Sequence, residues 1–236
     1  MPNTYFQFKQ FRIEQDKCSM KVCTDSCLFG AWISAEEDVK SILDIGTGTG
    51  LLSLMLAQKS DAQIDAIEID ENACQQAKEN FNNSIWKERL KVLAGDIRTM
   101  ELPKKYDMVV CNPPFYQDEL SSVLPGEKIA KHSLHLSLTE LISSIEKVLN
   151  ANGKFAILLP YYRKSEFEQL AAQYHLFPEK TILIKQSTSH DFFRYAGIFS
   201  KTEKAAIPEE MIAIKTKHQH YTSEAIHLLQ PYYLFL

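Results

Sequence analysis

The chain has 236 residues, of which 45% are hydrophobic and 11% aromatic, so it can bury a complete core, and α/β domains of this length commonly form one unit. Its formal net charge is -4 and its pI is near 6.0, which excludes a protein that holds nucleic acid by its overall charge. No apolar run reaches the roughly 18 to 20 residues needed to cross a bilayer, and the first residues lack the order of a signal peptide. We therefore expect a soluble, cytoplasmic protein, with no membrane partner.

The N-terminal aromatics Phe6, Phe8 and Phe11 predict a short strand that buries one aromatic face. From Lys40 onward, apolar runs alternate with segments of helical periodicity, the pattern of a parallel sheet covered on both faces. We predict strands at 41–45, 63–69, 90–93, 106–111, 154–159, 180–185 and 194–199, and helices at 51–58, 71–82, 138–149 and 164–174. The last two strands are joined by a stretch too short for a crossover helix, so we expect an antiparallel hairpin at the sheet edge.

A glycine-rich turn follows the strand at 41–45. Gly46, Gly48 and Gly50 allow positive φ angles and close backbone approach, and the helix that follows favours a negative group at its N-terminus. In an open parallel sheet, ligands bind beyond the carboxyl ends of the strands, where this turn lies. Taken alone, the turn fits a dinucleotide-dependent oxidoreductase as well as other nucleotide-binding enzymes.

Acidic residues end the next two strands. Glu68 is placed to accept hydrogen bonds from both ribose hydroxyls of a nucleoside. Asp96 is placed to accept one from an adenine amino group, with Ile69 and Ile97 on the two faces of the ring. The alternative is that Asp96 caps the turn that follows it, as Asp often does.

The sequence Asn112-Pro113-Pro114-Phe115 follows the strand at 106–111. An amine conjugated to a ring is planar and weakly nucleophilic until two acceptors hold its two N–H groups. The Asn112 side-chain oxygen and the Pro113 carbonyl are two such acceptors. The prolines stiffen the backbone, and Phe115 offers a flat apolar face for a base. The motif therefore predicts methylation of an exocyclic amine or an amide.

Together these features resemble the class I S-adenosylmethionine-dependent methyltransferases over about residues 40–201, which implies a doubly wound, Rossmann-like α/β fold of seven mostly parallel strands with the last antiparallel. Residues 20–25, 30–32, 130–132, 221–224 and 232–234 are more closely similar to the bacterial family that methylates N6 of an adenine next to the anticodon of a valine tRNA. The chain departs from that family in carrying Cys23 and Ser26 where glycine is usual.

The resemblance implies a single methyltransferase domain made of an N-terminal segment (1–39) that covers substrate and cofactor, a core (40–201) and a C-terminal extension (202–236). It implies S-adenosyl-L-methionine as cofactor, tRNA as partner and direct in-line transfer to a flipped-out adenine, with no catalytic metal. The cofactor-binding candidates are Asp44, Gly46, Thr47, Gly48, Gly50, Glu68, Ile69, Asp96, Ile97 and Thr24. Nothing in composition or spacing predicts an oligomeric state.

Basic residues near the predicted cleft are candidates for RNA contacts: Lys21, Lys128, Lys131, His132, Arg163 and Arg194. Solvated lysines are common on any surface, so these runs also fit an ordinary charged face. The spacing of Cys18, Cys23 and Cys27 matches no common zinc pattern, which favours small buried apolar residues over metal ligands.

Three other activities use similar chemistry. A glutamine N5-methyltransferase faces the same two-donor problem in an amide, but such enzymes carry a helical domain before the cofactor fold, for which 40 residues are too few. A DNA adenine methyltransferase would need an added recognition domain. Guanine N2 methylation of ribosomal RNA is a further alternative. Another is an inactive nucleotide-binding module, but the presence of Asn112, Glu68 and Asp96 argues against it.

Overall fold

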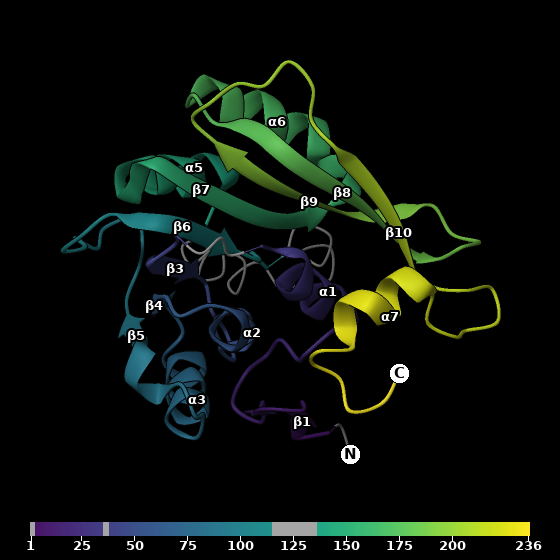
Figure 1. Ribbon diagram of the computed structural model, residues 1–236. Coiled ribbons are helices and arrows are strands. Elements are labelled where there is room, and N and C mark those ends of the chain that lie inside the picture. Colours follow the sequence, from purple (N-terminus) through teal and green to yellow (C-terminus); the bar gives the residue numbers. More distant parts are fainter. Residues whose placement is uncertain (1–2, 35–37, 115–135) are drawn as a thin grey trace, which may run out of the picture.

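The computed structural model describes residues 3–34, 38–114 and 136–236. The described residues form an eight-stranded sheet with helices on both faces, and a separate two-stranded hairpin (Figure 1). The strands are β1 (Tyr5–Gln7), β2 (Arg12–Glu14), β3 (Ser41–Ile45), β4 (Gln63–Glu68), β5 (Leu90–Ala94), β6 (Tyr106–Cys111), β7 (Leu149–Pro160), β8 (Phe177–Ser187), β9 (Phe192–Ser200) and β10 (Glu209–Lys215). The helices are α1 (Thr24–Trp32), α2 (Leu51–Lys59), α3 (Glu71–Asn82), α5 (Leu138–Val148), α6 (Lys164–Gln173) and α7 (Ser223–Leu229), with short 3-10 turns at Lys87–Arg89 and Tyr161–Arg163.

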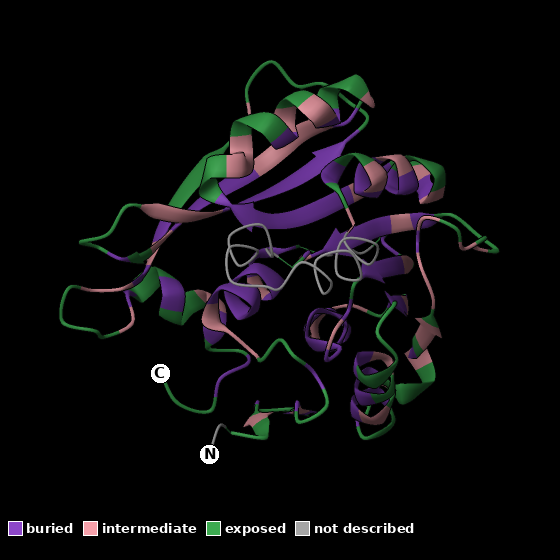
Figure 2. Ribbon diagram, turned by 180° about the vertical axis from the view of Figure 1, so that it is seen from behind, coloured by how far each residue is buried: buried purple, intermediate pink, exposed green. Residues whose placement is uncertain are grey.

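The order of the large sheet is β10-β8-β9-β7-β6-β3-β4-β5, and its strands from β7 to β5 are parallel. Helices α1, α2 and α7 cover one face over a core that includes Leu28 and Met55, and α5 and α6 cover the other over Ile145 and Phe167. Strands that are buried on both faces appear in the sequence as continuous apolar runs rather than as alternating patterns. The ends of such runs are easy to recognise, and the predicted bounds of β3 and β6 are therefore correct. Figure 2 shows the buried strands between partly exposed helices.

The seven predicted strands and the α/β class are confirmed, but the edge position of the last hairpin is wrong. Strand β9 lies between β7 and β8 and is antiparallel to both. An eighth strand, β10, pairs in parallel with β8 and covers the backbone edge that the hairpin would have exposed. Only Ile212 and Ile214 of β10 are buried, so its apolar signal is too short to predict a strand.

Helix α1 was not predicted because it is buried on almost every side. Seven of its nine residues are buried, so it lacks the apolar stripe of a surface helix. It packs tightly on α2, where a Cβ at Gly30 would lie 2.7 Å from the Met55 sulfur. At its C-terminal end, the amine of Lys59 donates to the carbonyls of Gly30 (2.6 Å), Ala31 (3.1 Å) and Ile33. One lysine from α2 thus satisfies backbone carbonyls at the C-terminal end of α1 that lack a partner within the helix.

Replacing Lys59 with methionine should lower the free energy of unfolding by about 2 kcal/mol, because three carbonyls lose their N–H donor while the apolar stem stays in place. Chemical denaturation measures the change. Lys78→Met on the exposed side of α3 is the matched control and should change stability by less than about 0.5 kcal/mol. Equal stability of the two variants would contradict a capping role for Lys59.

The N-terminal aromatics bury one face, as predicted. Phe8 and Phe11 are buried and their rings stack with centroids 4.4 Å apart, while Phe6 packs beside them. This cluster meets the C-terminal segment, where Phe8 forms a β-bridge with Tyr233. In the described ranges no helix is both long and apolar enough to span a membrane.

Candidate active site

The predicted functional residues lie at one edge of the sheet. Strands β3, β4, β5 and β6 are parallel, so their carboxyl ends, with the residues that follow them, share that edge. From β3 the chain adds β4 and β5 on one side and then crosses to β6 on the other. The β3–β6 boundary is therefore the switch point at which sheets of this kind bind their ligands.

The three glycines of the first turn have different surroundings. Gly46, Gly48 and Gly50 have φ angles of 71°, 55° and 83°, which side chains rarely adopt. Among the described residues, a Cβ at Gly46 or Gly48 would meet nothing within 4 Å, whereas one at Gly50 would lie 2.5 Å from the Phe81 ring. The first two glycines border open space that fits a ligand, and the third allows α2 and α3 to pack closely.

Asp44, at the end of β3, is buried with one oxygen unpartnered. Its Oδ2 accepts hydrogen bonds from the hydroxyls of Thr47 and Ser53, both at 2.7 Å. Its Oδ1 has no partner among the described residues, and burial raises the pKa of the carboxyl to about 6. Buried acceptors are usually satisfied, so this oxygen suits a cationic or N–H donor on a ligand.

Glu68 ties the end of β4 to the glycine turn. One carboxylate oxygen accepts the N–H of Gly48 at 2.8 Å, and the other accepts those of Ile69 and Asp70 at 2.9 and 3.0 Å. A carboxylate has about four acceptor positions, so these bonds leave room for a further donor. Ile69 beside it is 39% exposed, whereas Ile97 is buried.

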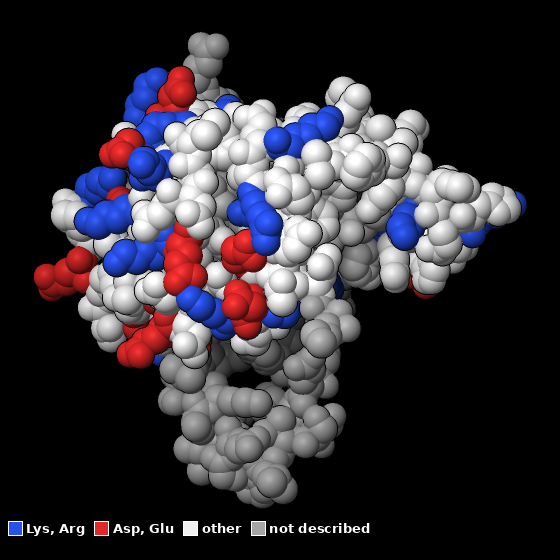
Figure 3. Space-filling model, turned by 90° about the horizontal axis from the view of Figure 1, so that it is seen from below, with Lys and Arg blue, Asp and Glu red and all other residues white. Residues whose placement is uncertain are grey.

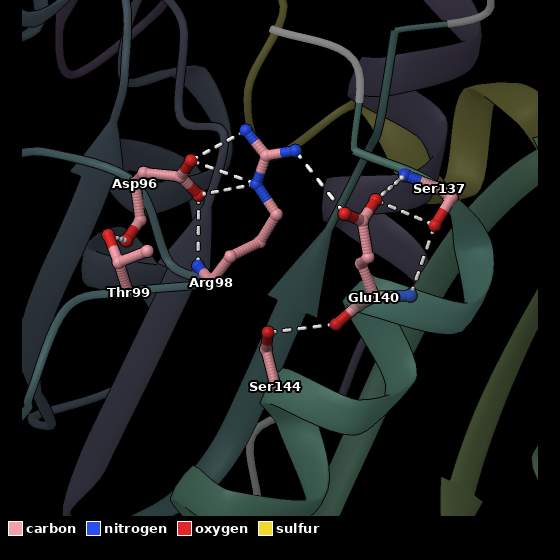
Figure 4. A network of polar contacts seen from close by, with 6 residues as sticks. All are labelled: Asp96, Arg98, Thr99, Ser137, Glu140 and Ser144. Atoms are coloured by element: carbon pink, nitrogen blue, oxygen red, sulfur yellow. Dashed lines mark hydrogen bonds and ion pairs between the residues drawn. The ribbon is translucent and has the colours of Figure 1, made fainter. Parts of the chain in front are cut away.

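Asp96 caps the turn after β5, as in the alternative interpretation. Its Oδ1 accepts the N–H of Arg98 at 2.9 Å, and its carboxylate pairs with the Arg98 guanidinium at 2.6 Å. That guanidinium holds the pKa of Asp96 below its usual range, so the side chain stays an acceptor. Arg98 also reaches Glu140, which forms a capping box with Ser137 at the start of α5 (Figure 4). The network fixes the start of α5 beside the carboxyl end of β5.

Asn112 also has a buried oxygen without a partner. Its Nδ2 donates to the Ser26 hydroxyl at 2.8 Å, and its Oδ1 is buried with no hydrogen bond from the described residues. Pro113 is buried and Pro114 exposed, while Phe115 lies outside the described residues. An acceptor is thus present where the motif predicts one, and Ser26, which sequence analysis noted only as a departure from the family, holds the other end of the amide.

Three of the six candidates for RNA contacts make contacts within the protein. Arg194 pairs with buried Asp25 at 2.7 Å, Arg163 pairs with Glu166 at 2.8 Å, and the Lys21 amine donates to the carbonyls of Gln15 and Cys18. The candidates Lys128, Lys131 and His132 lie outside the described residues. The face in Figure 3 intersperses acidic and basic side chains instead of gathering one sign.

One cofactor-binding candidate, Thr24, and the five cysteines are still to be placed in the structure. Thr24 begins this helix beside Tyr233. Cys18, Cys27 and Cys111 are buried and Cys23 and Cys74 half-buried, all as free thiols. Within the part of the chain that the structure describes, no three His, Cys, Asp or Glu side chains gather in a way that would hold a metal ion.

Solved structures share this architecture. A predicted O-methyltransferase from Agrobacterium tumefaciens superposes with a TM-score of 0.65 at 15% identity, covering 87% of this chain and 95% of its own. A putative RNA methyltransferase from Pyrococcus horikoshii has a TM-score of 0.54 at 17% identity, with 76% and 83% covered. The family model described as methyltransferase small domain matches residues 25–160. Fold and site define a class I S-adenosylmethionine-dependent methyltransferase.

Sequence relatives narrow the family. A tRNA1(Val) (adenine(37)-N6)-methyltransferase from Christiangramia forsetii is 39% identical over 241 residues, with both chains covered completely. A protein of the same name from Bacteroides thetaiotaomicron is 40% identical over 238 residues, again over all of both chains. The chain belongs to the tRNA1(Val) (adenine(37)-N6)-methyltransferase family.

Proposed function

We propose that this protein transfers a methyl group from S-adenosyl-L-methionine to N6 of adenine 37 in tRNA1(Val). The observation that carries the proposal is the buried Oδ1 of Asn112, which has no partner in the described part of the chain and lies at the same sheet edge as the glycine turn. Full-length similarity to relatives named for this reaction supports the choice of substrate. That substrate class also supports a cytoplasmic location.

The cofactor supplies an activated methyl group on a sulfonium. We assign its methionine end to Asp44 and to the turn formed by Gly46, Thr47, Gly48 and Gly50, whose open side fits a ligand. Its ribose belongs beside Glu68, and its adenine between Ile69 and Ile97 with the amino group at Asp96. Thr24 and the segment 1–39 cover this side of the core (40–201), with 202–236 as an extension of the same domain.

The protein's part in the transfer is positioning. Asn112 Oδ1 and the Pro113 carbonyl accept the two N–H groups of the adenine amine and draw its nitrogen toward tetrahedral geometry, in line with the methyl group. Pro114 stiffens the motif, and Phe115 stacks on the base. No general base is needed at the outset, because the proton leaves after the nitrogen has been alkylated.

For the RNA backbone, we retain Lys21, Lys128, Lys131, His132, Arg163 and Arg194 as candidates. Arg163 pairs with Glu166 and Arg194 with Asp25, and a phosphate would have to share these guanidinium groups with their carboxylates. Both lie by the carboxyl end of β7, the neighbour of β6, because Arg194 pairs in register with Pro160. Both arginines are therefore at the end of the strand next to β6, which the Asn112 motif follows.

Cofactor affinity should fall as the pH drops through 6. The pKa of Asp44 is about 6 in the free protein, and a bound cation favours its ionised form, so affinity weakens by up to about tenfold per pH unit below that value. Without cofactor, the Asp44 carboxyl itself is more protonated in the native state than in the unfolded chain between about pH 4 and 6, so its own contribution to stability is lost as pH rises through this window. Calorimetric titration from pH 5 to 8 measures the affinity, and Asp44→Asn should flatten the slope. A wild-type affinity independent of pH would contradict this role.

In the direct test, the protein is incubated with a labelled methyl donor and with separate pools of unmodified tRNA, ribosomal RNA, DNA and release-factor protein. Label recovered as N6-methyladenosine from tRNA is the expected result. Label in N2-methylguanosine of ribosomal RNA or in protein glutamine would overturn the substrate, and label in no pool would favour an inactive binding protein.

A further inference from the structure

A chain of polar contacts runs from β9 through the start of α1 to Asn112. Arg194 donates to Asp25 at 2.7 Å, the Cys23 sulfur lies 2.9 Å from the Ser26 hydroxyl, and that hydroxyl is 2.8 Å from Asn112 Nδ2. Asp25 and Ser26 are 8% and 5% exposed. These contacts are therefore shielded from competing water.

The chemistry of the end groups fixes the direction of the Arg194–Asp25 bond and favours one direction for the Cys23–Ser26 contact, in which either atom can donate. A guanidinium only donates, and the carboxylate of Asp25 only accepts. Burial and the nearby charge of Asp25 raise the pKa of the Cys23 thiol to about 11, so it keeps its S–H proton at neutral pH. An S–H group turned toward that carboxylate leaves the sulfur to accept the Ser26 O–H. The Ser26 oxygen then has lone pairs only for an N–H donor.

We propose that Ser26 is a positioning residue that selects one of the two orientations of the Asn112 amide, with Oδ1 toward the reacting amine. The inference rests on the proposed function. In the other orientation, the Asn112 NH₂ would face the amine's own N–H groups, and two donors cannot bond to each other. The Asp25–Arg194 pair and Cys23 act through Ser26 by fixing which way its hydroxyl points.

A double-mutant cycle separates this role from simple packing. Ser26→Ala should lower kcat for tRNA methylation by about tenfold, the value of one buried hydrogen bond, with cofactor affinity unchanged within about twofold. In an Asn112→Asp background the two carboxylate oxygens are equivalent acceptors, and there is no orientation to select. There, Ser26→Ala should change kcat by less than about twofold, although the background itself is slower.

Cys23 gives a second measurement that does not depend on the activity of Asn112→Asp. Cys23→Ser keeps both a donor and an acceptor and should keep kcat within about twofold, whereas Cys23→Ala should lose about three- to tenfold. Thermal unfolding of each variant checks that the fold is intact.

Equal losses from Ser26→Ala in both backgrounds, or equal kcat in Cys23→Ser and Cys23→Ala, would overturn the proposal. Unchanged kcat in Ser26→Ala would do so as well, with the proposed function intact. Failure of the wild-type protein to methylate any tRNA would instead overturn the proposed function.

Discussion

Replacing Asn112 with alanine should lower the rate of methyl transfer to tRNA at least about a hundredfold. The loss is large because Oδ1 acts on an amine that becomes a nucleophile only when its N–H groups are held, so the interaction is made mainly in the transition state. Cofactor affinity should stay within a few-fold, since Asn112 follows β6 whereas the cofactor residues follow β3, β4 and β5. Single-turnover kinetics and calorimetry measure the two quantities separately.

Asn82→Ala, at an exposed position at the end of α3, is the matched control and should methylate tRNA at the wild-type rate. A normal single-turnover rate in Asn112→Ala would remove Asn112 from the reaction. A parallel loss of cofactor affinity would point instead to collapse of the sheet edge.

Replacing Glu68 with alanine should weaken cofactor binding by about a hundredfold, or about 3 kcal/mol. The substitution removes the acceptor assigned to the ribose and also leaves the N–H groups of Gly48, Ile69 and Asp70 without their carboxylate. The glycine turn would then lose its tie to β4. At saturating cofactor, kcat should fall by less than about fivefold, because the acceptors for the amine are untouched.

Glu71→Ala supplies the control, because this exposed side chain lies in the first turn of α3, three residues beyond Glu68. Calorimetric titration of both variants with cofactor decides the outcome. Wild-type affinity in Glu68→Ala would place the ribose elsewhere, and a loss confined to kcat would assign Glu68 to the substrate side.

The sheet and the ends of its strands could be predicted because one physical cause governs both. Strands covered on both faces are continuous apolar runs, and parallel strands bring the residues after Ile45, Glu68 and Cys111 to one edge. The alternative that Asp96 caps a turn rests on the frequent use of Asp as a cap, and in the structure the capped N–H belongs to Arg98, only two residues away. Local chemistry of this kind is visible in sequence.

Contacts between distant segments could not be predicted. Asn112 meets Ser26 from 86 residues away, and Arg194 meets Asp25 from 169 residues away. Both depend on where α1 docks, and α1 has no periodic pattern because it is buried nearly all round. The departure from the family at Cys23 and Ser26 is the available signal, and its meaning depends on Asn112, which follows β6.

The docking of α1 also has a consequence for how the protein is made. Helix α1 packs against α7, and the Tyr232 hydroxyl reaches the Met55 carbonyl on the neighbouring helix α2 at 3.3 Å. Figure 1 shows the purple α1 against the yellow α7. A nascent chain that has left the ribosome as far as Ser200 holds the strands from β3 to β9, Asn112 and the contacts of α1 with α2, yet lacks the contacts of α1 with α7. We expect full activity to arise only late in synthesis, when these last residues have packed against α1.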